Sequence, residues 1–239
     1  MLNDIPSPWD LLLQPDVPTL AYRPELLRLS DSAGRERIAV LLKDPRTITI
    51  DDTVEMQLRD LLKTRDPAQK LDDATANERM RAHLQGQPLY TYGVWVWYPW
   101  SRRLVHLLDE SEFVELRTNR NKFKITSEEQ AKLASNRVGI AGLSVGHAIA
   151  LNIALERTAG ELRLADFDHL ELSNLNRIRS TVFGLNLPKV VNTAREIAEL
   201  DPFLQVTCFG EGLHAGNYED FLTNGGTLIL SLMSATVLM

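Results

Sequence analysis

The chain has 239 residues, of which 44% are hydrophobic and 24% are charged, and its formal net charge is −6. This length allows one or two domains with packed cores, and so ordinary a composition excludes a wholly disordered chain. The acidic balance argues against a nucleic-acid partner, because general affinity for a phosphate backbone requires a basic face.

Cysteine content and the chain's first residues point to an intracellular protein. The single cysteine, Cys208, excludes an intramolecular disulfide, and without a CxxC pair we expect no structural zinc site. The opening MLNDIPSPWD has an early acid and no apolar core, which argues against a secretory signal. No run of about 18 uncharged apolar residues predicts a membrane span. We therefore expect a cytoplasmic protein with no membrane partner.

Residues 1–114 form the first predicted region, to which no function is assigned. Helices are predicted at 33–43, 52–64 and 67–85. In VEMQLRDLLKT the apolar residues keep mostly to one helical stripe, which is typical of a face packed on a core. Three segments rich in aromatic and β-branched residues then predict a small antiparallel sheet, at 90–100, 102–109 and 112–119.

Residues 115–239 form the second predicted region, in which helices and strands alternate. TSEEQAKLA begins with Thr126 or Ser127 as a helix cap, and the strand RVGIAGLSVG (137–146) follows it. The expected order continues with helix 147–160, strand 162–165, helix 188–200, strand 203–209, helix 216–223 and strand 227–233. This alternation predicts an α/β fold with a doubly wound, Rossmann-like and mostly parallel sheet.

The glycines that end the first strand of this region admit two interpretations. A glycine at the strand end lets the chain turn sharply into a helix, whose free N–H groups can bind a phosphate. Gly142 supplies such a turn, and Asp166 follows at the spacing expected for an acid that binds a ribose hydroxyl. The motif departs from GxGxxG, because Ser144 and Val145 interrupt it and Gly146 comes one place early. A nucleotide site and a purely structural turn both remain open on this motif alone.

Polar residues after the second strand favour the nucleotide site. Asp166 is followed by Asp168, Asn174 and Arg177, and Lys189 comes shortly after them. Carboxylate, amide, guanidinium and ammonium groups together suit a nucleoside triphosphate. Arg177 and Lys189 can neutralise three phosphates and stabilise a displaced pyrophosphate, while Asp166 holds the ribose and Asn174 orients the phosphates.

At this point the sequence resembles a known family. RVGIAGLSVG, LADFDHLELSNLNR and LPKVVNTAREIAELDP occur in that order and resemble the adenylation domain of ubiquitin-activating enzymes and of ThiF/MoeB-type activators of sulfur-carrier proteins. The resemblance covers residues 115–232, about half of the chain. It implies that the aspartate after the second strand contacts the ATP ribose, and that the asparagine, arginine and lysine contact the phosphates. The nucleotide-binding residues it implies are Gly142, Ser144, Gly146, Asp166, Asp168, Asn174, Arg177 and Lys189.

The segment RTNR (117–120) resembles a further family element. In that family the second arginine of an RxxR segment reaches into the ATP site of a partner subunit, which makes Arg120 a candidate catalytic residue beside Arg177 and Lys189. The resemblance then implies a homodimer. The alternative interpretation is a solvated basic turn, because two arginines at this spacing are common in charged loops.

The reaction implied by the resemblance is carboxylate activation. ATP with Mg²⁺ reacts with a terminal carboxylate, often that of a small ubiquitin-like or sulfur-carrier protein ending in Gly-Gly. The products are an acyl adenylate and pyrophosphate. Positioning and charge stabilisation suffice for this step.

The chain also departs from the family pattern. The family places a magnesium-binding aspartate after the next strand, but GTLILS is followed by LMSATVLM, so no magnesium ligand is found in this chain. We therefore expect a carboxyl-terminally truncated, impaired member, and two alternatives stay open. One is a non-catalytic scaffold relative, and the other is an NAD(P)-dependent oxidoreductase built on the same strand–helix–strand unit. His147, beside the glycine turn, either meets a phosphate or fills the turn.

Overall fold

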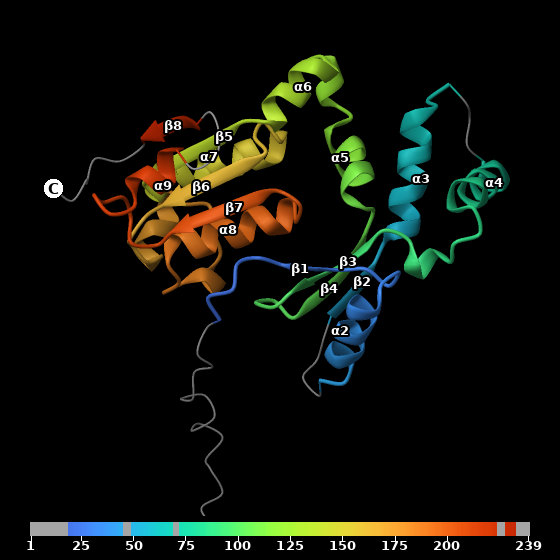
Figure 1. Cartoon of the computed structure of the whole chain (residues 1–239), viewed down its shortest axis with the longest axis horizontal. Helices are drawn as coiled ribbons and strands as arrows, with labels where there is room; N and C mark the ends of the chain where they lie inside the picture. Colours follow the sequence, from blue (N-terminus) through green and yellow to red (C-terminus); the bar gives the residue numbers. More distant parts are fainter. Residues whose placement is uncertain (1–18, 45–48, 69–71, 224–227, 233–239) are drawn as a thin grey trace, which may run out of the picture.

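The computed structural model describes residues 19–44, 49–68, 72–223 and 228–232. Figure 1 shows an amino-terminal part on one side and a larger α/β part on the other. No helix within the described ranges is long and apolar enough to cross a membrane.

The amino-terminal part is built around one four-stranded sheet. Its order is β1-β3-β4-β2, with β1, β3 and β4 antiparallel and β2 parallel to β4. The strands are β1 (Glu25–Leu27), β2 (Thr49–Asp52), β3 (Val94–Tyr98) and β4 (Arg103–Leu107). The helices are α2 (Ser32–Leu42), α3 (Val54–Arg65), α4 (Asp73–Leu84) and α5 (Glu110–Thr118), with the 3-10 turns η1 (Leu89–Thr91) and η2 (Asn121–Phe123). The predicted antiparallel pairing of segments 90–100 and 102–109 is confirmed as β3 and β4. The three predicted helices are also confirmed, although the third begins at Asp73 and not at residue 67, whereas β1 and the parallel strand β2 were not foreseen.

The prediction of a strand at 112–119 is wrong, because this segment lies in helix α5. Asp109 caps the helix by accepting a hydrogen bond from the Glu110 backbone N–H at 2.8 Å. Glu110 and Glu112 add negative charge to the first turn, where the helix dipole favours it. Phe113 packs against the apolar cluster of α3. Capping and packing together outweigh the modest strand propensity of the segment.

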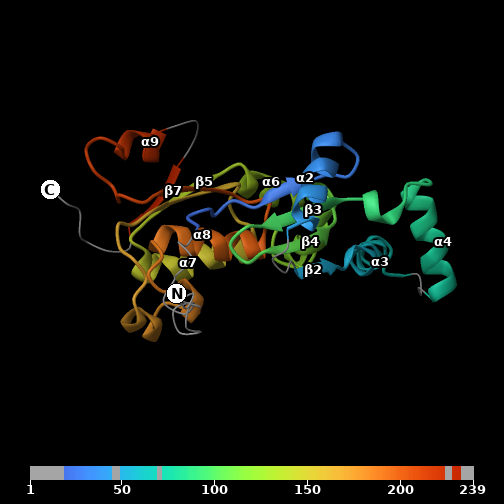
Figure 2. The ribbon, with the colours of Figure 1, turned by 90° about the horizontal axis from the view of Figure 1, so that it is seen from below.

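The carboxyl-terminal part is a parallel sheet of order β7-β6-β5-β8. Its strands are β5 (Arg137–Ala141), β6 (Glu161–Ala165), β7 (Gln205–Phe209) and β8 (Leu228–Leu232). Its helices are α6 (Ser127–Ala134), α7 (Leu143–Glu156), α8 (Lys189–Leu200) and α9 (Tyr218–Thr223), with η3 (Leu172–Asn176) and η4 (Val182–Gly184). Figure 2 shows α7 and α8 on one face of the sheet and α9 on the other. The predicted doubly wound α/β fold is confirmed, with β5 at the point where the strand order reverses.

The core of this part lies between the sheet and α7 and α8. It contains Val138, Ile140, Leu162 and Leu164 from the strands, and Ala150, Ala154, Ala194 and Ile197 from the helices. Alanines on the inner helix faces let both helices approach the sheet closely. Burying each large aliphatic side chain contributes about 1.5–3 kcal/mol, so this interface stabilises the helix positions that shape the site.

Helix α7 begins earlier than the sequence predicted, at Leu143 rather than at residue 147. Gly142 precedes it with φ of 85°, a left-handed conformation that favours glycine. Ser144 and Gly146 therefore lie in the first turns of the helix and not in a loop. The helix ends at Glu156, with Arg157 as its C-cap, and not at Gly160. Gly160 instead allows a close approach of the chain, because a Cβ there would lie 2.0 Å from the Ala134 carbonyl oxygen.

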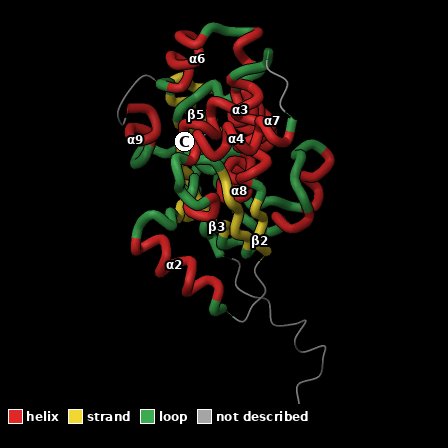
Figure 3. Tube along the Cα trace, turned by 90° about the vertical axis from the view of Figure 1, so that its right-hand side faces the viewer, coloured by secondary structure: helices red, strands yellow, loops and turns green. Residues whose placement is uncertain are grey.

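A buried ion pair lies where the two parts meet. Asp201 is fully buried at the end of α8, accepts a hydrogen bond from Arg157 and accepts another from the Phe203 backbone N–H at 3.0 Å. Arg117 of α5 donates to the Ala154 and Leu155 carbonyls in the last turn of α7, and burial lowers its pKa. Helix α5 lies between the two parts (Figure 1), while α2 and α6 lie at opposite ends of the molecule (Figure 3).

Candidate functional site

The carboxyl ends of β5 and β6 bring the glycine turn and Asp166 together. The backbone N–H of Gly142 donates to the Ala165 carbonyl at 2.8 Å, which fixes the turn beside β6. Asp166 then accepts a hydrogen bond from the Leu143 N–H at 2.6 Å and another from the Asp168 N–H at 2.8 Å. A carboxylate thus lies at the amino terminus of α7, where the helix dipole favours negative charge.

A buried cation lies next to this turn. The Lys189 ammonium is 2.7 Å from Asp168 Oδ2 and 3.3 Å from Ser144 Oγ. The Lys189 side chain is only 5% exposed, whereas that of Asp168 is 51% exposed. The backbone explains the contact, since the two arms of the loop after β6 pair and the Lys189 N–H donates to the Asp168 carbonyl at 2.9 Å. A positive charge is therefore held between α7 and the end of β6, with an open carboxylate beside it.

Three other predicted residues have no described contact with this cluster. Asn174 is buried and accepts a hydrogen bond from the Glu171 N–H at 3.1 Å, which shapes the turn η3. Arg177 is exposed and donates to the neighbouring Asn176 side chain at 3.1 Å. Arg120 is exposed just before η2. The geometry thus joins Gly142, Ser144, Asp166, Asp168 and Lys189, places Gly146 in the buried side of α7, and leaves Asn174, Arg177 and Arg120 apart.

A second polar cluster lies beneath the loop after β6, and of its members the sequence singled out only His147. His147 Nε2 is 2.6 Å from Glu196 Oε2, and Ser180 Oγ donates to the other oxygen of Glu196 at 2.6 Å. Asn192 donates to both Ser180 and Glu196, at 2.9 and 3.0 Å. For its other members, the spacing of Asn192 and Glu196, four apart on α8, was the visible signal.

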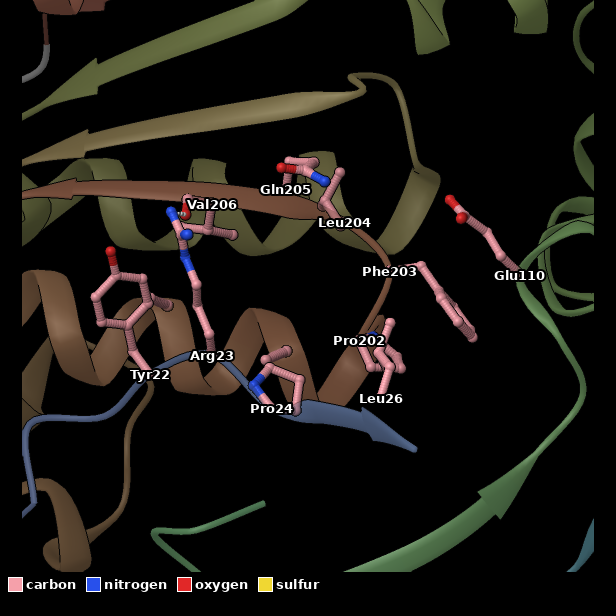
Figure 4. A pocket seen from close by; sticks show the side chains of 12 residues that line it. Tyr22, Arg23, Pro24, Leu26, Glu110, Pro202, Phe203, Leu204, Gln205 and Val206 are labelled. Carbon is pink, nitrogen blue, oxygen red and sulfur yellow. Dashed lines mark hydrogen bonds between the residues drawn. The ribbon is translucent and has the colours of Figure 1, made fainter. Parts of the chain in front are cut away.

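A pocket of about 220 Å³ lies outside both clusters. Figure 4 shows it between the chain leading into β1 and the start of β7, with Phe203 and Glu110 at one side. Arg23 points to the strand and donates to the Val206 carbonyl at 3.2 Å. The pocket shares no residue with the Gly142–Lys189 cluster, so it is not a candidate for the nucleotide site.

The described residues offer no cluster of metal-binding side chains. Residues 19–44, 49–68 and 72–223 contain no group of three or more His, Cys, Asp or Glu that could hold a metal ion. The stretch after β8, where the resemblance implied a magnesium ligand, lies outside the described residues.

Solved structures similar to this chain include two proteins of E. coli. The tRNA N6-threonylcarbamoyladenosine dehydratase TcdA is 20% identical with a TM-score of 0.45, over 48% of this chain and 49% of TcdA. MccB, solved with MccA-N7isoASN, is 16% identical with a TM-score of 0.40, over 69% of this chain and 49% of MccB. TcdA has also been solved in complex with ATP. Likeness at this level assigns no substrate to the chain.

Sequence comparison is more specific. The chain is similar to the uncharacterized protein MT1398 of Mycobacterium tuberculosis (strain CDC 1551 / Oshkosh), with 49% identity over 128 residues. This match covers 54% of this chain and 18% of MT1398. Residues 118–233 match the model of the ThiF family. These residues include the glycine turn, Asp166, Asp168 and Lys189. From residue 118 to residue 233, this chain is a ThiF family domain.

Proposed function

We propose that this domain binds ATP across the carboxyl ends of β5 and β6 and transfers AMP to a carboxylate. The observation that carries the proposal is the buried Lys189 ammonium, held against Asp168 and Ser144 beside the first turn of α7. Burying an ammonium is costly unless it is paired, and a structural contact here would need no charge. A phosphate-binding lysine at a helix amino terminus accounts for both features.

The residues of the cluster have distinct proposed roles. Asp166 binds the ribose hydroxyls, and the free N–H groups of α7 and Lys189 bind the phosphates. Asn174 and Arg177 approach from the loop after β6, and Arg120 approaches from a second copy of the chain. None of these three contacts the cluster among the described residues, so their roles depend on the loop's position and on a homodimer.

The proposed chemistry needs only positioning and charge stabilisation. An oxygen of the substrate carboxylate attacks the α-phosphorus of ATP, the bond between this phosphorus and the pyrophosphate oxygen breaks, and an acyl adenylate forms. Lys189 stabilises the negative charge on the departing pyrophosphate. Magnesium, when bound, neutralises the phosphates, and it takes most of its ligands from phosphate and water. The sequence offers no counterpart of the family aspartate after β8, so we assign one ligand of such an ion to the half-exposed carboxylate of Asp168.

The proposed substrate is the terminal carboxylate of a small ubiquitin-like or sulfur-carrier protein ending in Gly-Gly, in the cytoplasm. Two alternatives remain, a scaffold that has lost turnover and an NAD(P)-dependent oxidoreductase.

Calorimetric titration with ATP and with NADH, followed by ATP–pyrophosphate exchange, tests the proposal. We expect ATP to bind and exchange to require a Gly-Gly carrier drawn from a panel. ATP binding without exchange for any carrier would favour the scaffold, and binding of NADH in preference to ATP would favour the oxidoreductase. Lys189→Met should raise the Kd for ATP by roughly 10- to 150-fold, while Lys132→Met, a matched change on the exposed face of α6, should leave it unchanged.

A further inference from the structure

The loop between β6 and α8 begins and ends at the candidate site. Its two arms pair, with the Leu170 N–H donating to the Leu187 carbonyl and the Asn186 N–H donating to the Leu170 carbonyl, each at 2.8 Å. Beyond this pairing lie η3 and η4, and residues 171–185 carry both Asn174 and Arg177. The position of these two residues thus depends on what holds the far end of the loop.

The far end is held against α8 by polar contacts and close packing. Ser180 donates to Glu196 at 2.6 Å, and Asn192 donates to Ser180 at 2.9 Å. Gly184 packs so tightly on Asn192 that a Cβ at residue 184 would lie 2.1 Å from Asn192 Oδ1. Glu196 is thus the carboxylate on which the loop's hydroxyl contact depends.

His147 holds Glu196 from the other side. Its Nε2 is 2.6 Å from Glu196 Oε2, and because a carboxylate only accepts, this nitrogen carries a proton. The ring is 1% exposed, and its Nδ1 has no hydrogen-bond partner among the described residues. A buried unsatisfied nitrogen is unfavourable, so a side chain that only filled space here would be apolar.

The position of His147 on α7 connects its contact with Glu196 to the candidate site. His147 lies one turn after Leu143, whose N–H is bound by Asp166. The chain of contacts His147–Glu196–Ser180 therefore connects the first turns of α7 with the loop that carries Arg177. Each contact in this chain is 2.6 Å, typical of strong hydrogen bonds to a carboxylate.

We propose that His147 is a positioning residue that acts through Glu196 and Ser180 to fix the loop 171–185 against α7 and α8. It thereby sets the distance of Asn174 and Arg177 from the phosphate-binding turn. This consequence for the nucleotide rests on the proposed function, whereas the tether itself does not.

Hydrogen–deuterium exchange and ATP titration on the full chain test the two parts separately. The variants are His147→Phe, which keeps a ring without a donor, His147→Gln, which restores a donor, and Ser180→Ala. His214→Ala, an exposed histidine of another loop, is the matched control. Without nucleotide, we expect His147→Phe and Ser180→Ala to speed amide exchange in 171–185 at least tenfold. His147→Gln should restore much of the protection, and the control should match the wild type.

For ATP, we expect the Kd of His147→Phe to rise about tenfold while the thermal midpoint of unfolding changes little. Unchanged exchange in both the His147→Phe and Ser180→Ala variants would overturn the tether. A loosened loop with the wild-type Kd for ATP would overturn its positioning role. If the wild type itself fails to bind ATP, the proposed function fails, and the exchange measurement alone still decides whether the tether exists.

Discussion

Lys189→Met should separate binding of ATP from stability of the fold. The wild-type ammonium is 95% buried, paired with Asp168 at 2.7 Å and with Ser144 at 3.3 Å. Methionine has a similar length and no charge, so it can fill the same space. Replacing a buried ion pair by an apolar side chain is often neutral, or stabilising by about 1–4 kcal/mol. The Asp168 carboxylate left behind is half exposed and can be solvated, so we expect the free energy of unfolding to change by less than about 1 kcal/mol or to rise.

The same substitution should weaken ATP binding strongly, although it leaves the fold as stable as before or more stable. A charge-assisted hydrogen bond to phosphate contributes about 1.5–3 kcal/mol, which corresponds to roughly 10- to 150-fold in Kd. Urea unfolding followed by fluorescence of the four tryptophans measures stability, and calorimetry measures ATP affinity. Lys132→Met should leave both quantities at their wild-type values. A loss of more than about 3 kcal/mol in stability with no change in Kd would show that Lys189 is structural, and would refute its assignment to the phosphates.

Two substitutions and one chemical modification test other parts of the fold. Asp201→Ala removes the buried partner of Arg157, whose guanidinium then keeps only the more exposed Glu110 carboxylate at 3.4 Å. It should lower the free energy of urea unfolding by about 3 kcal/mol, and a loss below about 1 kcal/mol would contradict the ion pair. Gly184→Ala forces a methyl group against Asn192 and should cost about 1–3 kcal/mol in the same assay, whereas an unchanged midpoint would mean the loop yields freely. Burial raises the pKa of the Cys208 thiol from 9.0 to about 12. Its reaction with iodoacetamide at pH 8 should therefore be much slower in native than in unfolded protein. Because the unfolded thiol loses its proton first, stability should also fall as pH rises from about 9 to 12.

The fold was predictable where local patterns and the rules of parallel sheets agree. Alternating strands and helices from residue 137 onward allow few arrangements, because crossover connections are short and right-handed. Neighbouring parallel strands end at the same edge, so the spacing between Gly142 and Asp166 already predicted that they would meet. The strand prediction for residues 112–119 was wrong because their aromatic and β-branched content does not outweigh the helix cap at Asp109.

The sequence predicted which residues belong to the site, but not all of the contacts between them. Asp168 and Lys189 were both named, but their direct pairing comes from the two arms of a long loop, which no local pattern reveals. His147 was recognised beside the glycine turn. Its partner Glu196 lies on a different helix, and the periodicity of a helix does not predict contacts between residues so far apart in the sequence. The roles of Arg177 and Arg120 stay predictions, since they need a loop position and a second chain.

In the Gly142–Lys189 cluster, carboxylates of the chain satisfy the groups that would bind a polyphosphate in the proposed site. Asp166 accepts the first N–H of α7, and Asp168 pairs with Lys189. The Leu143 N–H and the Lys189 ammonium both lie in buried residues, and leaving either unpaired would cost free energy. Pairing them within the chain stabilises the fold. If the proposed function holds, ATP competes with Asp168 for the ammonium, or shares it through a magnesium ion. Affinity for ATP alone should then be lower than that for its magnesium complex, because only the cation removes the repulsion between the phosphates and this half-exposed carboxylate.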